Sequence, residues 1–319
     1  MGAKASHEDL VKLLEKLQEA GIQALVIPGN HDLDSTSALS FSGEDYASTD
    51  SITADEFEAL YAPFGPEQAL SQDEHTLSYV YALRKDLRVL MLDANGGGWC
   101  SVPDETVEWV EKQLKAAKKA GAKVIAASHQ NIDIHNPRFT WGYQIVEGDA
   151  LAALYEKYGV VCNLSGHLHN QHIVGGAVPE VATSALSIAP NQYGIIRYNG
   201  KTCSYETKQL DVSTWAEKNG RTDPELLDFA AYSAEFMVSV NRDKTAAKLA
   251  DSGLAEADIA LLADTFGRLN AAYFAGAPFD PTPYEAVVEL WQAKVGNGYL
   301  ESVLAGAGEE HRVLTVSLP

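Results

Sequence analysis

Three short apolar runs, each followed by a polar turn that contains histidine, constrain the fold of this chain more than any other feature. The turns read Gly29-Asn30-His31-Asp32, Ser128-His129 and Gly166-His167-Leu168-His169. Each run predicts a buried strand, and loops at strand ends are where binding and catalytic side chains collect. We therefore expect Asn30, His31, His129, His167 and His169 to converge at one rim of a sheet.

The turn at Gly29–Asp32 allows two interpretations. Gly, Asn and Asp form turns readily, so this stretch fits an Asx-type turn after a buried strand. An amide oxygen, an imidazole and a carboxylate are also the parts of a metal-assisted hydrolytic site. The pair His167 and His169 favours the second interpretation, because residues two apart in an extended segment point the same way.

In this order the residues resemble the calcineurin-like metallophosphoesterase family and its bacterial members. The motifs of that family are Asp-x-His, Gly-Asp, Gly-Asn-His-Asp/Glu, a lone strand-end His and Gly-His-x-His. The last three occur here, over about residues 5–210, and Gly166-His167-Leu168-His169 is the most specific of them. The resemblance implies an α/β fold in which a two-sheet sandwich is flanked by helices.

The resemblance also implies roles for the motif residues. Asn30, His129 and His167 match ligands of one metal ion, and His169 matches a ligand of a second. His31 matches the acid that protonates the leaving oxygen or binds phosphate, and Asp32 would orient its imidazole, an ordinary carboxylate–imidazole arrangement. Mixed nitrogen and oxygen ligation suits Mn, Fe or Zn. The implied activity is hydrolysis of phosphate monoesters or diesters by a metal-activated water.

The first two motifs of the family are missing, since nothing before residue 29 reads Asp-x-His or Gly-Asp. These motifs supply the bridging carboxylate and two ligands, so we expect one metal ion or none here instead of two. Two explanations stay open: a shortened, impaired copy of an active enzyme, or a degenerate, non-catalytic binding module. A shortened copy would leave a sheet incomplete, which predicts lower stability and self-association through the exposed edge.

The predicted secondary structure of the chain changes near residue 211. Helical patterns rich in Ala and Leu cover residues 224–240, 243–250, 256–275 and 283–304, and residues 311–318 predict a terminal strand. We therefore expect a metallophosphoesterase-like domain over residues 1–210, incomplete at its N-terminus, and a C-terminal helical appendage over residues 211–319. Upstream, the patterns predict helices at 6–20, 53–61, 104–120 and 147–158, and a strand at 22–27.

The charge of the chain bears on its partners. The net charge of −20 disfavours nucleic acid, which binds clustered Lys and Arg, and it disfavours anionic membranes. Small phosphoesters are the expected substrates. No run of eighteen apolar residues and no signal peptide occurs, so localisation stays open; export is expected if a missing N-terminus carried a signal. The three cysteines show no C-x-x-C spacing and predict neither disulfides nor a zinc knuckle.

Overall fold

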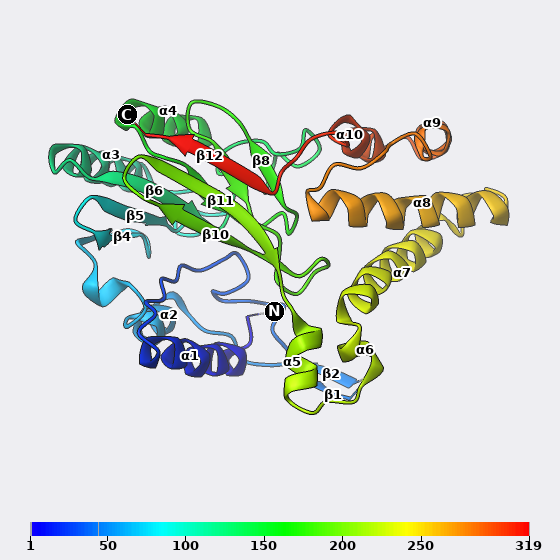
Figure 1. Ribbon diagram of the computed structural model, residues 1–319, viewed down its shortest axis with the longest axis horizontal. Coiled ribbons are helices and arrows are strands. Elements are labelled where there is room, and N and C mark those ends of the chain that lie inside the picture. Colours follow the sequence, from blue (N-terminus) through cyan, green and yellow to red (C-terminus); the bar gives the residue numbers. More distant parts are fainter. Residues whose placement is uncertain (1, 44, 319) are drawn as a thin grey trace. The chain divides into compact units, whose positions relative to one another are not determined.

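The structure is a computed structural model that describes residues 2–43 and 45–318 (Figure 1). The chain divides into two compact units. The first unit contains the residues up to 134 together with 141–167 and 175–180, and the second contains 135–140, 168–174 and the residues from 181 on. The architecture is mixed α/β, with a main sheet flanked by helices and a C-terminal helical region. None of the described helices is both long and apolar enough to cross a membrane.

The first unit is built on the main sheet. Its helices are α1 (Lys4–Glu19), α2 (Ala54–Tyr61), η1 (Pro66–Gln68), α3 (Asp104–Lys119) and α4 (Gly148–Tyr158). Its strands are β1 (Leu39–Ser42), β2 (Asp45–Ser48), β3 (Ser71–Gln72), β4 (Tyr79–Arg84), β5 (Leu87–Leu92), β6 (Lys123–Ser128) and β7 (Asn163–Ser165). In the sheet the order is β3-β4-β5-β6-β7, with β5, β6 and β7 parallel. The four helices expected upstream of residue 160 are thus confirmed.

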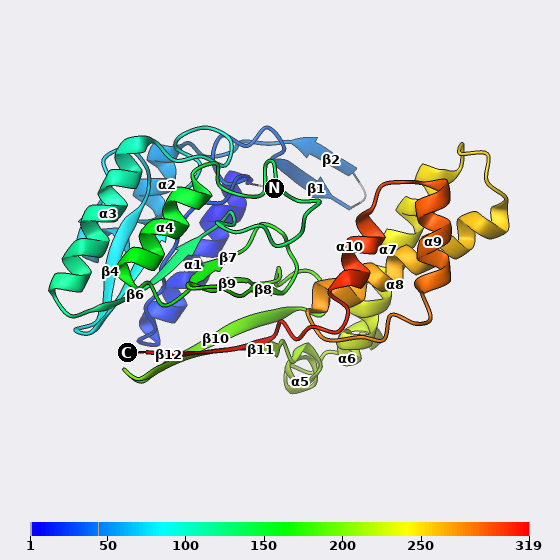
Figure 2. The same ribbon diagram turned by 90° about the horizontal axis from the view of Figure 1, so that it is seen from above.

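Helices α3 and α4 cover one face of the main sheet, and Figure 2 shows them side by side. The core beneath them joins β4, β5 and β6 to both helices through Val80, Leu90, Ala126, Leu114 and Tyr155. Strands β5 and β6 are apolar on both faces, as parallel strands buried on both sides are. Their alternate side chains, such as Val89 and Met91, belong to a separate cluster on the opposite face of the sheet.

The segment 22–27 lies on that opposite face, but it is not a β-strand, which corrects the prediction. Its side chains alternate: Leu25 and Ile27 pack with Val89 and Met91, whereas Val26 packs in the cluster of α1 and α2. Within the described part of the chain no strand pairs with this segment. A strand needs a neighbour to complete its backbone hydrogen bonds, so the apolar pattern alone gives an extended segment here.

Tyr79 makes hydrogen bonds to the backbone of segment 22–27 that a neighbouring strand would otherwise make. Its hydroxyl accepts a hydrogen bond from the Val26 amide (2.9 Å) and donates to the Val26 carbonyl (3.0 Å). The Val26 amide also donates to the carbonyl of Phe64 (3.1 Å). Burial raises the pKa of Tyr79, so the phenol stays neutral and keeps its proton for this contact.

The second unit contains the C-terminal helices and a small sheet. Its helices are α5 (Val212–Lys218), α6 (Pro224–Leu227), α7 (Phe229–Leu249), α8 (Glu256–Ala275), α9 (Glu285–Lys294) and α10 (Tyr299–Ala305). Its strands are β8 (His172–Val174), β10 (Gln192–Tyr198), β11 (Thr202–Gln209) and β12 (Val313–Ser317), and β9 (Glu180–Ala182) begins at the last residue of the first unit. Strands β10, β11 and β12 form an antiparallel sheet, which confirms the terminal strand.

Two expectations about the helices need correction. The sequence predicts separate helices at 224–240 and 243–250, but the break lies instead at Asp228, between α6 and α7, and α7 runs without a break through residue 242. Residues 283–304 were expected as one helix, but α9 and α10 are separate, because the link between them places Gly296 and Gly298 at φ of 71° and 65°. Only glycine adopts these angles without strain, so the helix ends there.

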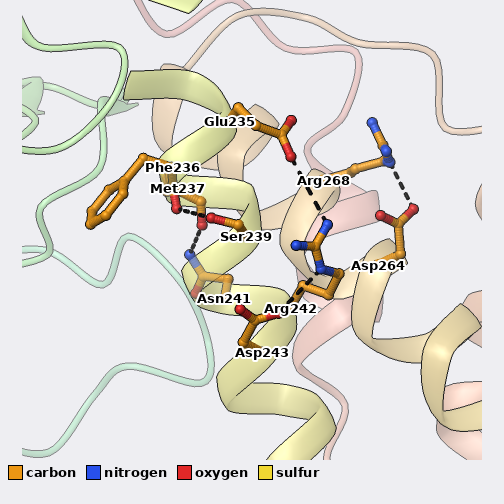
Figure 3. Close-up of polar contacts among 9 residues, drawn as sticks. All are labelled: Glu235, Phe236, Met237, Ser239, Asn241, Arg242, Asp243, Asp264 and Arg268. Atoms are coloured by element: carbon orange, nitrogen blue, oxygen red, sulfur yellow. Dashed lines mark hydrogen bonds and ion pairs between the residues drawn. The ribbon is translucent and has the colours of Figure 1, made fainter. Parts of the chain in front are cut away.

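Helices α7 and α8 pack against each other, and Figure 3 shows polar side chains on part of the pair. The close approach depends on Gly267, because a Cβ atom at this position would lie 2.6 Å from the carbonyl oxygen of Val238. The amide of Asn270 donates across the pair to Asn241 (3.1 Å). The ion pairs drawn in Figure 3 involve exposed side chains, which contribute little to stability.

Tyr79→Phe should lower the free energy of unfolding by about 1–2 kcal/mol, because the Val26 carbonyl then loses its buried donor. Urea denaturation measures the effect. Tyr81→Phe, on the same strand, is the matched control and should change stability by much less. Equal stability of the Tyr79 variant and the unmodified chain would contradict the structural role given to this hydroxyl.

Gly267→Ala should destabilise the second unit by about 1–3 kcal/mol, since the added methyl group overpacks the α7–α8 contact. The control is Gly308→Ala, where a Cβ atom meets nothing within 4 Å. Thermal melting followed by circular dichroism compares the two. A melting temperature that falls no further for the Gly267 variant than for the control would argue against this packing.

Candidate functional site

The turn after segment 22–27 presents Asn30 and His31. The Asp32 amide donates to the Gly29 carbonyl (3.1 Å), and the Asp32 carboxylate accepts from the Gly29 amide (2.7 Å). These two bonds close the turn. Gly29 is also in close contact with His129, since a Cβ atom at position 29 would lie 2.9–3.0 Å from three atoms of the imidazole. A side chain at position 29 would therefore push the turn away from His129.

His129 follows directly on β6, the strand between β5 and β7. Its Nε2 lies 2.9 Å from Oδ1 of Asn30, although the two residues are far apart in sequence. Its carbonyl accepts a hydrogen bond from the Gly166 amide (3.0 Å), which ties the end of β6 to the turn after β7. The carboxyl ends of parallel strands form the rim where this contact is made.

His167 completes a group of three. Its Nδ1 lies 3.2 Å from Asn30 Oδ1 and 3.3 Å from His129 Nε2. Its Nε2 lies 2.9 Å from the carbonyl of Gly142, to which it donates when Nε2 carries the proton. The Nδ1 lone pair then points at the other two atoms, as in a metal-binding histidine whose second nitrogen bonds a carbonyl.

These three donor atoms fit a single metal ion. Their separations are 2.9, 3.2 and 3.3 Å. An ion bonded to nitrogen and oxygen at about 2.0–2.2 Å holds neighbouring donors about 3 Å apart. Over residues 2–43 and 45–318, however, no group of three or more His, Cys, Asp or Glu side chains is placed to hold a metal. The group therefore offers one face of a coordination sphere, with two imidazoles and one amide.

The other expected site residues are placed as follows. His31 is exposed, and Asp32 is engaged with its own turn and lies 3.8 Å from Nε2 of His7. His169 is exposed and belongs to the second unit. His167 and His169 were expected in an extended segment, but β7 ends at Ser165 and both histidines have φ of 62°, outside an extended strand. The metal role of His169 stays a prediction.

Several supporting residues could not be identified from the sequence. Asn95 connects three segments: its amide donates to the carbonyl of Pro28 (3.3 Å) and to Asp93 (2.7 Å), and it accepts from Gln130 (2.9 Å). An Asn in a glycine-rich loop carries no signal for this role. Asp93 accepts from the backbone amide of Asn95 (3.0 Å), which closes an Asx turn, and burial raises the pKa of its carboxyl group.

His7 was also missed. It is buried in α1, with Nδ1 2.9 Å from the Tyr61 hydroxyl. Its Nε2 lies 3.8 Å from the Asp32 carboxylate, beyond hydrogen-bond distance, so the link between α1 and the turn that presents Asn30 is one of proximity alone. The sequence hides the link, since a polar residue at the start of a helix is usually exposed.

A cavity of about 1030 Å³ opens beside the turn. It lies within the first unit and is lined by Asn30, His31, His75, Thr76 and Trp99, among others. Ligand pockets commonly have volumes of about 300–1,000 Å³. The site therefore combines three convergent donor atoms with room for a small molecule.

Comparison with known proteins extends this description. Residues 3–171 match the family described as calcineurin-like phosphoesterase, and residues 211–303 match the C-terminal domain of cyclic nucleotide phosphodiesterase. No curated protein gives a significant match.

Solved structures also resemble the chain. One is a dimetal phosphatase from Danio rerio, with 10% identity, a TM-score of 0.46, and coverage of 64% of this chain and 75% of that one. Another is GAP50, the anchor in the inner membrane complex of Plasmodium, with 12% identity, a TM-score of 0.32, and coverage of 41% and 48%. The first family match spans more than half of the residues, so the chain belongs to the calcineurin-like phosphoesterase family.

Proposed function

We propose that this protein hydrolyses phosphate esters with the help of a divalent metal ion. The observation that carries the proposal is the triangle of donor atoms from Asn30, His129 and His167, of which Asn30 lines the cavity. Membership in a phosphoesterase family supports it. The combination matters, because convergent ligands without a cavity, or a cavity without ligands, would not favour hydrolysis.

In this proposal the triangle holds one ion, and His169 contributes to a second where other ligands complete it. Two imidazoles and an amide oxygen suit Mn, Fe or Zn. When bound, such an ion supplies positive charge for the phosphoryl oxygens and an activated water. The chain's own contribution is to fix the donors: the Gly142 carbonyl orients His167, and the absence of a side chain on Gly29 admits His129.

His31 and Asp32 provide the proton chemistry in this proposal. His31 is exposed on the cavity wall, where a protonated imidazole can donate to the oxygen that leaves phosphorus. Asp32 fixes the backbone of the turn through the Gly29 amide. Asp32 is the neighbour that orients the His31 imidazole in this proposal.

The substrate we propose is a small phosphoester. The name of the family matched by residues 211–303 favours cyclic nucleotides, which are phosphodiesters. The net charge of −20 argues against a long nucleic acid, because binding to its backbone needs clustered cations.

We further propose a phosphoesterase domain over residues 1–210 and a C-terminal domain over 211–319. The family matches at 3–171 and 211–303 support this division. The two-sheet sandwich implied by the resemblance is part of the same proposal.

A non-catalytic binding role is the second candidate. It is favoured by one observation: among the described residues, no carboxylate joins the histidines in a group that could hold a metal. The two candidates differ in whether a bound phosphoester is turned over, so the assays below separate them.

Titration of the full chain with Mn²⁺ should give at most one tightly bound ion, because the triangle offers ligands for one. His129→Ala and His167→Ala should each weaken Mn²⁺ binding at least about tenfold, since each removes one of the three donor atoms. His75→Ala, an exposed histidine of the same cavity, is the control and should bind Mn²⁺ normally. Two tight ions per chain, or normal binding by the His129 variant, would contradict the assignment.

Turnover of phosphate esters with Mn²⁺ tests the reaction itself. His31→Ala should slow hydrolysis of an alkyl phosphate ester by roughly 10²–10⁴-fold, the usual contribution of a general acid. The loss should be smaller for a 4-nitrophenyl ester, whose leaving phenolate is stable without a proton. Equal losses on both esters would exclude proton donation by His31. No turnover of any monoester or diester by the metal-loaded chain would favour the binding role.

A further inference from the structure

Trp99 stands out on the cavity wall. Its side chain is 59% exposed and lines the same cavity as Asn30 and His31. A large aromatic ring that stays exposed in a cavity keeps a flat apolar face available to a ligand. The question is whether this ring is held in place or merely lies on a loose loop.

The backbone around Trp99 is fixed by hydrogen bonds. The Gly97 amide donates to the Ser101 carbonyl (3.1 Å), and the Ser101 amide donates to the carbonyl of Ala94 (3.1 Å). Cys100 has φ of 54°, its carbonyl accepts from the Val146 amide (2.8 Å), and its thiol donates to the Gly142 carbonyl (3.0 Å). These contacts hold residues 94–101 in a tight loop, and the indole of Trp99 projects from this loop.

The indole also touches the segment that orients a metal-binding histidine. A Cβ atom on Gly142 would lie 2.8 Å from Nε1 of Trp99, so the ring lies directly against this residue. The carbonyl of the same Gly142 accepts from Nε2 of His167. One residue therefore separates the aromatic face from the donor triangle, and neither can shift without affecting the Gly142 backbone.

We propose that Trp99 is the stacking platform for the nucleobase of a nucleotide substrate whose phosphate binds at Asn30, His129 and His167. The placement of the phosphate rests on the proposed function, whereas the stacking itself does not. Base–aromatic stacking contributes about 1–3 kcal/mol per base and accepts every base, since each has a π-face. Trp99 thus sets specificity for the class of ester, nucleotide over alkyl phosphate, and leaves the choice of base open. His75 and Thr76, on the cavity wall, are the polar groups available to the sugar or base.

Two test ligands distinguish the contribution of the base to binding from that of the phosphate. Calorimetric titration of the Mn²⁺-loaded chain compares adenosine 5′-monophosphate with ribose 5-phosphate, which lacks the base. Trp99→Ala should weaken binding of the nucleotide roughly 5- to 150-fold, the affinity equivalent of the stacking energy, and leave ribose 5-phosphate unchanged. Trp99→Phe should retain most of the nucleotide affinity. The control is Trp141→Ala, which removes an even more exposed indole (85%) and should change neither affinity.

Adenosine alone provides the third arm, because it tests stacking without any phosphate. It should quench tryptophan fluorescence of the unmodified chain and of the Trp141 variant, but not of Trp99→Phe. Quenching by adenosine in a chain that binds no ribose 5-phosphate would reject the phosphoesterase proposal and keep the platform. Equal weakening of both ligands by Trp99→Ala, or unchanged nucleotide affinity, would overturn the platform. So would an unmodified chain that binds neither adenosine nor the nucleotide.

Discussion

The contact between Gly29 and the His129 imidazole is the constraint on which the rest of the site depends. It allows a turn near the N-terminus to reach the end of β6, so that Asn30 and His129 come within 2.9 Å. His167 joins them because the turn after β7 is tied to the His129 carbonyl. The absence of a side chain at position 29 is therefore required for the contact between Asn30 and His129, since a Cβ atom there would push the turn away from the imidazole.

The candidate site could be predicted in part from the sequence, because the three side chains that converge there belong to short local motifs. Asn30, His129 and His167 each follow an apolar run. The parallel strands β6 and β7 bring His129 and His167 to one rim, whereas Asn30 reaches it because segment 22–27 packs on the face of the same sheet. The supporting residues have no such signature. Gly142 acts through its carbonyl, which every residue possesses, and Asn95 acts by joining segments that only the tertiary structure brings together.

The fold could be predicted wherever local pattern and pairing agree. Helix α3 has acidic residues in its first turn, lysines in its last and a buried stripe between them, so its bounds were foreseen within a residue. Segment 22–27 has an equally clear apolar pattern but no paired neighbour among the described residues, and so it is extended without being a strand. Sequence periodicity reports which side chains are buried, whereas strand formation also depends on a partner located elsewhere in the chain.

The hydroxyl of Tyr79 makes two of the few backbone hydrogen bonds that hold segment 22–27. A phenol serves one residue, whereas a neighbouring strand would serve several, so segment 22–27 is held by side-chain packing and few backbone bonds. Regions held in this way open locally at a lower free energy than the sheet beneath them. Opening here would carry Asn30 away from His129 while β5 and β6 stay paired. Under the proposed function, an ion held by both residues would bind only the closed form, so ion affinity and local opening would be thermodynamically linked.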